Sequence, residues 1–243
     1  MSGHSKWSTI KRKKGALDQK RGKLFSSIGR EITISARLFG GDLESNARLR
    51  QAVKKAKSIN MPNANIEKAI KKGTGSLDNV SYEEASYEGY GPNGIAIFIE
   101  TITDNKNRTV ADIRHVLTKA GGSLGQSGSV AWNFNRMGII IVERSSIDED
   151  TIFNISIEND AKDFKVEDGY YKLFFDHSIL YEKIEIIEKN AIEIDSSFIA
   201  FIPKDFISVS VLDAEKIEKL IDSLEDLEDV QNVYANYKAE QSS

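Results

Sequence analysis

The chain has 243 residues, of which 40% are hydrophobic and 29% charged, and its formal net charge is −4 at pH 7. This length allows two or three compact domains, and the composition is that of an ordinary soluble globular protein. The chain has no cysteine, which excludes disulfides, thiolate metal sites and cysteine nucleophiles. No apolar run reaches the ~18 residues of a membrane span, and no apolar segment follows the basic amino terminus, so we expect a cytoplasmic protein.

The charge is divided unevenly along the chain. Residues 1–75 carry 18 Lys and Arg against 5 Asp and Glu, a net of +13, which leaves −17 for the remainder. Such asymmetry predicts a basic part that meets a polyanion such as nucleic acid. The alternative is that the basic and acidic faces attract each other within the molecule. The density of cations at the very start of the chain favours the polyanion.

The basic part divides into an arm and a helical domain. Residues 1–20 have no strong periodicity, and Trp7 lies among their cations, which suits a nucleic-acid backbone, although Trp7 could also dock the arm on the body. From residue 21 to 75 the apolar spacing predicts three helices with basic outer faces. The predicted contacts to nucleic acid in this part are Lys6, Lys11, Arg12, Lys13, Lys14, Lys20, Arg21, Lys23, Arg48, Arg50, Lys54 and Lys55.

A strand–helix–strand unit follows. The apolar run at residues 95–102 predicts a buried strand, a helix with an apolar face comes next, and residues 130–134 are predicted as a second strand.

The turn between the first strand and the helix has the sequence TDNKNRT, residues 103–109. Thr109 and Asp112 have the spacing of a variant capping box, so we expect them to cap the helix. Lys106 and Arg108 are not needed for the cap, and they stand at a helix amino terminus, where anions are favoured. The turn is therefore either a phosphate contact or a helix cap alone, and both stay open.

The remaining elements predict two similar α/β domains. Residues 138–203 follow the ferredoxin-like order β-α-β-β-α-β, and a strand–helix–strand at residues 207–237 completes a second such set with the unit at residues 95–134. We predict an α+β fold, in which an N-terminal three-helix domain is followed by two α/β domains, one inserted into the other. The expected parts are a basic arm (1–20), a helical domain (21–75), an interrupted α/β domain (80–135 plus 205–240) and an inserted one (136–204).

No set of residues predicts catalysis. The three histidines, His4, His115 and His177, lie far apart in the sequence and have no metal-ligand spacing. The stretch GGSLGQSG at residues 121–128 follows a helix rather than preceding one and lacks the Lys-Ser/Thr of a phosphate-binding loop, so it predicts a mobile or tight turn. We expect a protein that is not an enzyme, with no metal, cofactor or small-molecule substrate.

Several long motifs resemble those of the YebC family. They are GHSKW (3–7), KRG and LF (20–25), REI (30–32), NARLRQAVKKAK (46–57), NMPNANIEKAIKKG (60–73), YEGYGPNG (87–94), TDNKNRT and GSVAWNF (128–134). The resemblance is dense to about residue 143, thins through the inserted domain and returns at DLEDVQNVYANY (226–237). Leu43 and Ala47 stand where the family usually has proline, and Lys106 where arginine is common.

The resemblance implies three domains and two possible functions. Bacterial members, which include the PmpR regulators, are described as cytoplasmic transcriptional regulators that bind DNA, here through the basic arm and helical domain. The mitochondrial member, a translational activator of cytochrome oxidase, points instead to a ribosome-associated factor that binds ribosomal RNA through the same cations. The residues show no recognition helix with base-reading side chains, which favours RNA or shape readout.

Overall fold

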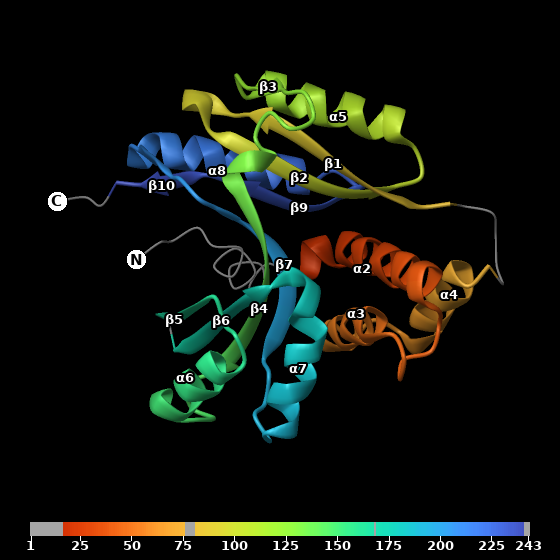
Figure 1. The fold of residues 1–243 in the computed structure, drawn as a ribbon. Coiled ribbons are helices and arrows are strands. Elements are labelled where there is room, and N and C mark those ends of the chain that lie inside the picture. Colours follow the sequence, from red (N-terminus) through yellow and green to blue (C-terminus); the bar gives the residue numbers. More distant parts are fainter. Residues whose placement is uncertain (1–16, 76–80, 168, 241–243) are drawn as a thin grey trace. The chain divides into compact units, whose positions relative to one another are not determined.

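The computed structural model of the chain describes residues 17–75, 81–167 and 169–240, with side chains from residue 22 onward. Among the described residues, three helices precede mixed α/β regions with antiparallel sheets, which confirms the predicted fold class (Figure 1). The chain divides into two compact units, and the second, from Phe134 to Ile202, is inserted between the two segments of the first. Within the described ranges, no helix combines the length and the apolar character needed to cross a bilayer.

The helical domain consists of α2 (Leu17–Phe39), α3 (Ala47–Ser58) and α4 (Asn63–Gly73). The predicted helices are confirmed, and the apolar stripe of α3 is buried as its spacing predicts. Asn46 is 2% exposed and connects α2 to α3, because its side chain accepts from Leu49 N and donates to the carbonyls of Ser35 and Gly40. At the end of α4 only glycine fits, since a Cβ on Gly73 would lie 2.3 Å from the carbonyl oxygen of Thr33.

The interrupted α/β domain is built on a four-stranded sheet in the order β3-β1-β2-β9. Its elements are β1 (Glu83–Tyr90), β2 (Ala96–Thr103), α5 (Lys106–Lys119), β3 (Ser123–Leu124), β8 (Ile207–Val209), α8 (Val211–Glu225), β9 (Val230–Ala235) and β10 (Tyr237–Ala239), with 3-10 turns at Pro92–Gly94 and Ala131–Asn133. Both α5 and α8 cover the sheet face that carries Ile97 and Ile99, while β8 and β10 form a separate parallel pair (Figure 1).

Two expectations for this domain need correction. First, the sequence pattern predicts no strand at residues 83–90, yet β1 pairs with β2 along its whole length, from Glu83 opposite Thr103 to Tyr90 opposite Ala96. Second, the strand predicted at residues 130–134 is wrong, because residues 131–133 form a 3-10 turn and β4 begins only at Phe134. The physical reason is that the amides of Val130 and Ala131 donate to the carboxylate of Glu88 rather than to a neighbouring strand.

The second unit has the predicted β-α-β-β-α-β order. Its elements are β4 (Phe134–Glu143), α6 (Glu149–Glu158), β5 (Asp163–Glu167), β6 (Tyr170–Asp176), a 3-10 turn (His177–Ile179), α7 (Leu180–Lys189) and β7 (Ser196–Pro203). The sheet order is β5-β6-β4-β7, with β6 antiparallel to both neighbours, as in ferredoxin-like folds. Its core is formed by α6 and α7 packed on one sheet face around Ile140, Leu173 and Phe175.

Candidate nucleic-acid interface

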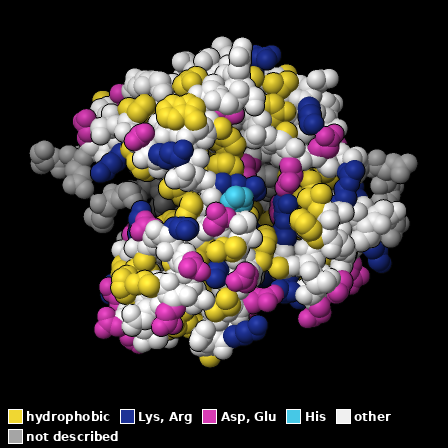
Figure 2. Space-filling model, in the orientation of Figure 1, with side chains coloured by type: hydrophobic (Ala, Val, Ile, Leu, Met, Phe, Trp, Pro, Cys, Tyr) yellow, Lys and Arg dark blue, Asp and Glu magenta, His cyan; other side chains and the backbone are white. Residues whose placement is uncertain are grey.

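The predicted phosphate contacts fall into three groups. Lys6, Lys11, Arg12, Lys13 and Lys14 lie outside the described residues, as do the side chains of Lys20 and Arg21, whose backbone belongs to α2. Lys54 and Lys55 have exposed side chains on α3. Lys23, Arg48, Arg50, Lys106 and Arg108 make contacts within the chain. On the face drawn in Figure 2, cationic side chains are interspersed with acidic ones rather than gathered into one patch.

Arg48 joins three elements. Its guanidinium donates to both oxygens of Glu31 on α2, at 2.8 and 3.1 Å, and its Nη2 lies 2.5 Å from Oε1 of Glu84 on β1. Although burial opposes the charge, these hydrogen bonds hold the pKa of Arg48 above its ordinary value. The fork geometry of arginine makes such a three-way connection possible, so Arg48 stabilises the domain.

Arg50 and Lys23 also stabilise the chain's own structure. Arg50 donates to the carbonyls of Leu43 and Glu44 at 2.8 and 3.1 Å and so closes the connection between α2 and α3. Lys23 donates to the carbonyl of Glu225 at the end of α8 and lies 3.5 Å from Oδ1 of Asp226. These cations have internal partners that any bound phosphate would have to share.

The TDNKNRT turn surrounds a buried carboxylate that sequence reasoning missed. Asp229, 3% exposed, accepts from Arg108, whose Nη2 lies 2.7 and 3.0 Å from its two oxygens. The hydroxyl oxygens of Thr103 and Thr109 lie 3.1 and 2.8 Å from its Oδ2, and Arg30 lies 3.3 Å from its Oδ1. Burial raises the pKa of Asp229, but the hydrogen bonds from Arg108 and Thr109 and the charge of Arg30 outweigh it and hold that pKa below its ordinary value.

The predicted capping residue of α5 is therefore wrong. The side chain of Asn105 caps the helix by accepting from Arg108 N at 3.1 Å, whereas Thr109 lies inside the helix and faces Asp229. Lys106 is exposed and pairs with Glu83 at 2.7 Å, and Arg108 also contacts Asp104 at 2.9 Å. Both cations stand at the start of a helix, as predicted, but each has acidic partners.

The glycine-rich stretch contains the short strand β3 and ends in a turn that one carboxylate holds. Glu88 on β1, 6% exposed, accepts from the amides of Gly128, Val130 and Ala131 at 2.7, 2.7 and 2.8 Å. Burial raises the pKa of Glu88, yet these three backbone donors lower it below its ordinary value. Trp132, in the 3-10 turn that follows, is 65% exposed. No sequence signal identifies Glu88, because its partners lie about 40 residues away.

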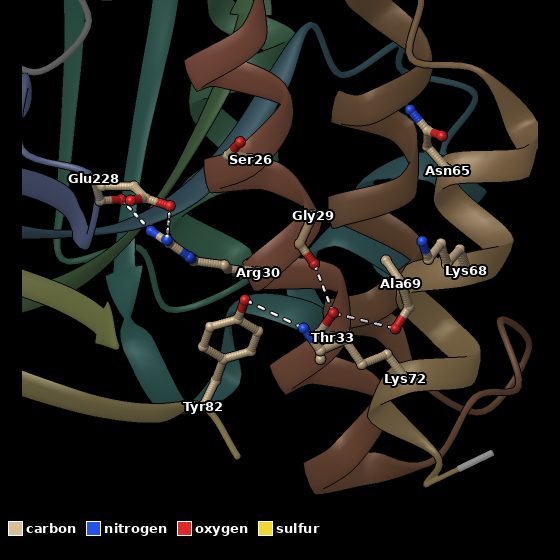
Figure 3. Close-up of a pocket in the computed structure, with 10 residues that line it drawn as sticks. All are labelled: Ser26, Gly29, Arg30, Thr33, Asn65, Lys68, Ala69, Lys72, Tyr82 and Glu228. Atoms are coloured by element: carbon tan, nitrogen blue, oxygen red, sulfur yellow. Dashed lines mark hydrogen bonds and ion pairs between the residues drawn. The ribbon is translucent and has the colours of Figure 1, made fainter. Parts of the chain in front are cut away.

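A pocket of about 370 Å³ opens between α2 and α4, beside the start of β1 (Figure 3). The polar side chains around it include Arg30, Asn65, Lys68, Lys72, Tyr82 and Glu228. Arg30 and Lys72 converge on Tyr82, with Arg30 Cζ 5.6 Å and Lys72 Nζ 4.6 Å from the ring centroid (Figure 3). The basic face of α4 is visible in the sequence, but the approach of Arg30, Tyr82 and Glu228 to it is not.

Comparisons with known proteins cover almost the whole chain. Residues 5–76 match the family described as TACO1/YebC protein N-terminal domain, and residues 82–237 match the TACO1/YebC second and third domain. A protein of Syntrophus aciditrophicus is 50% identical, over 98% of this chain and 95% of its own length. A protein of Chlorobaculum parvum is 49% identical, over 100% and 97%.

Both relatives are named "Probable transcriptional regulatory protein", which describes a regulator rather than an enzyme. Among solved structures, a conserved hypothetical protein from Aquifex aeolicus is similar, with a TM-score of 0.84 and 41% identity over 93% of each chain.

Proposed function

Because the chain belongs to the TACO1/YebC family, we propose that it is a transcriptional regulator that binds DNA through its basic arm and helical domain. The observation that carries the proposal is the net charge of +13 in residues 1–75 of a chain whose overall charge is −4. Phosphate contacts supply most of the affinity of proteins for DNA, and such a segment is a suitable electrostatic footprint.

The proposal is supported by the difference between cations that pair with carboxylates of the chain and cations that are exposed. Arg48 is tied to the carboxylates of Glu31 and Glu84 of the same chain, so it maintains the domain. Among the described residues, Lys57 on α3 and Lys68 on α4 have exposed side chains with no carboxylate partner. Ammonium groups on flexible stems contact phosphates without reading sequence, so we expect binding that is electrostatic and weakly sequence-specific.

Binding of the full chain to a labelled 20-base-pair duplex, followed by fluorescence anisotropy at 50 and 200 mM salt, tests the proposal. If six or more phosphates are contacted, affinity falls by roughly 10³-fold or more between the two salt concentrations. Reversing the charges of Lys11, Arg12, Lys13 and Lys14 to Glu abolishes most of the binding. A matched control reverses four exposed lysines elsewhere, namely Lys119, Lys189, Lys219 and Lys238.

Two outcomes would contradict the DNA assignment. One is equal affinity at both salt concentrations, or after charge reversal of the arm. The other is binding to an RNA hairpin of the same length without binding to the duplex. In that case cosedimentation of the cellular protein with ribosomes, and its loss on substituting Lys106 and Arg108, would establish the ribosome-associated function instead.

A further inference from the structure

We infer that the pocket between α2 and α4 seats one backbone phosphate of the bound nucleic acid, and that Glu228 competes with this phosphate for Arg30. The site presupposes the nucleic-acid binding proposed above and specifies where one phosphate is held. Its volume of about 370 Å³ lies within the range of small-ligand pockets.

The pocket has more positive than negative charge. Three cationic side chains line it, Arg30, Lys68 and Lys72, against one carboxylate, that of Glu228. Lys68 and Lys72 are four residues apart on α4, so their side chains project from the same side of the helix. In the part of the chain that the structure describes, neither lysine has a carboxylate partner. An anion in the pocket would therefore meet two ammonium groups that have not been neutralised.

The walls of the pocket are held in place before any ligand arrives. The hydroxyl oxygen of Thr33 lies 2.8 Å from the carbonyl oxygen of Gly29 and 3.2 Å from that of Ala69, which joins α2 to α4 beside the pocket. Lys72 Nζ lies 3.3 Å from the hydroxyl oxygen of Tyr82 and packs over its ring, so its position is restrained by a neutral group. A site with ordered cations loses less entropy on binding.

Glu228 differs from the other partners of Arg30. The side chain of Arg30 is 8% exposed, whereas that of Glu228 is 69% exposed and lies at the rim. Arg30 also donates to the backbone carbonyl of Glu228 and pairs with the buried Asp229 at 3.3 Å. If the Glu228 carboxylate moves away, Arg30 keeps these two partners and gains a free donor. A phosphate can take that place, since guanidinium binds phosphate as it binds carboxylate.

The first test is the salt dependence of binding, with the same labelled duplex and a single-stranded RNA of equal length as probes. Lys68→Gln and Lys72→Gln each remove one cation from the pocket. Lys71→Gln on the same helix and Lys119→Gln on α5 remove the same charge elsewhere. Each pocket variant is expected to make the negative slope of log affinity against log salt shallower by about 0.9 and to lower the affinity in 0.1 M salt by roughly 5- to 10-fold. The two control variants should change the slope and the affinity less than half as much as the pocket variants do.

Lys68 has no partner in the described residues, so its substitution leaves the fold intact, and thermal melting checks this for every variant. If Lys71→Gln weakens binding as much as Lys68→Gln, the contacts are spread over α4 and the pocket is not a site, although the proposed function would stand. A wild-type chain that binds neither probe at 50 mM salt would overturn the function and the site together.

The second test concerns Glu228. Glu228→Gln removes the competing charge while the backbone carbonyl and Asp229 still hold Arg30. Asp222→Asn, on the exposed side of α8, removes an equal charge away from the pocket. This control measures how much affinity rises simply because the chain has one negative charge fewer. We expect Glu228→Gln to raise affinity for the probes at least 3-fold more than Asp222→Asn does. Equal gains would overturn the role of Glu228 as a competitor.

Discussion

Asp229 is a buried residue that connects several elements of the first unit. Its carboxylate receives Arg108 from α5, Arg30 from α2 and the hydroxyls of Thr103 and Thr109, so one buried group connects three parts of the chain. A buried carboxylate is tolerated only when its charge is paired and its lone pairs are satisfied, and both conditions hold here.

Replacing this carboxylate tests the connection. We expect Asp229→Asn to lower the free energy of unfolding by about 3 kcal/mol, the low end for unpairing a buried charge, because Arg30 keeps Glu228 and Arg108 keeps Asp104. Asp226→Asn is the control, since its exposed pair with Lys23 is worth less than about 1 kcal/mol. Urea unfolding measures both, and equal effects would contradict the prediction.

The stability loss caused by Asp229→Asn should depend on pH. The pKa of Asp229 is lower in the folded chain, so its contribution to stability is fully present above the unfolded-state pKa, near 4. The contribution is lost as the pH falls through the folded-state pKa. The stability difference between the wild type and Asp229→Asn should therefore be constant from pH 5 to 7 and shrink below about pH 4. A difference that grows on acidification would refute this assignment.

Among the elements, the connection between α2 and α3 relies on Asn46. Asn46→Ala removes the cap of α3 and the side-chain amide that donates to the carbonyls of Ser35 and Gly40. We expect the free energy of unfolding to fall by roughly 2 kcal/mol, about half from the lost cap and half from the lost hydrogen bonds to the two carbonyls. Asn63→Ala, at the exposed start of α4, is the matched control and should change stability by less than about 0.5 kcal/mol. Thermal melting distinguishes the two variants, and similar decreases in melting temperature would argue against the role of Asn46 in connecting α2 to α3.

Elements with a complete local pattern could be predicted from the sequence. The three helices of the first domain have apolar residues at helical spacing, and the inserted domain has six segments in a recognisable order. Strand β1 could not be predicted, because its sequence EEASYEGY alternates weakly and gains its stability from pairing with β2. The capping box, which is a local rule, predicts Thr109 as the cap of α5, and the rule fails here because Asp229 binds that hydroxyl from 120 residues away.

For the candidate site, too, local sequence patterns do not predict contacts between residues far apart in the chain. The basic faces of α3 and α4 follow from helical periodicity alone. Periodicity does not show which of these cations remain available to a ligand. Arg48 pairs with Glu84, and Lys23 with Asp226, only after the chain has folded. Charge counts therefore locate the basic domain, and the folded contacts select among its cations.

At the scale of the whole molecule, the two units have separate hydrophobic cores. Ile97, Ile113 and Leu117 belong to the core of the α/β domain in the first unit, whose helical domain has a core of its own, whereas Leu173 and Phe175 belong to the core of the second unit. Units with their own cores open locally rather than all together, and amide exchange reports each opening separately.

Leu117→Ala and Leu173→Ala form a matched pair, because both side chains are fully buried and lose the same atoms. Each should cost about 2–5 kcal/mol in the unit that contains it. In hydrogen exchange, Leu173→Ala is expected to speed exchange within residues 134–202 only, and Leu117→Ala within residues 83–124 and 207–237. Uniform acceleration over both units by either variant would mean that the chain unfolds as one cooperative body. The inserted unit could then not be altered without disturbing the basic domain, whereas independent opening would allow the two parts to be changed separately.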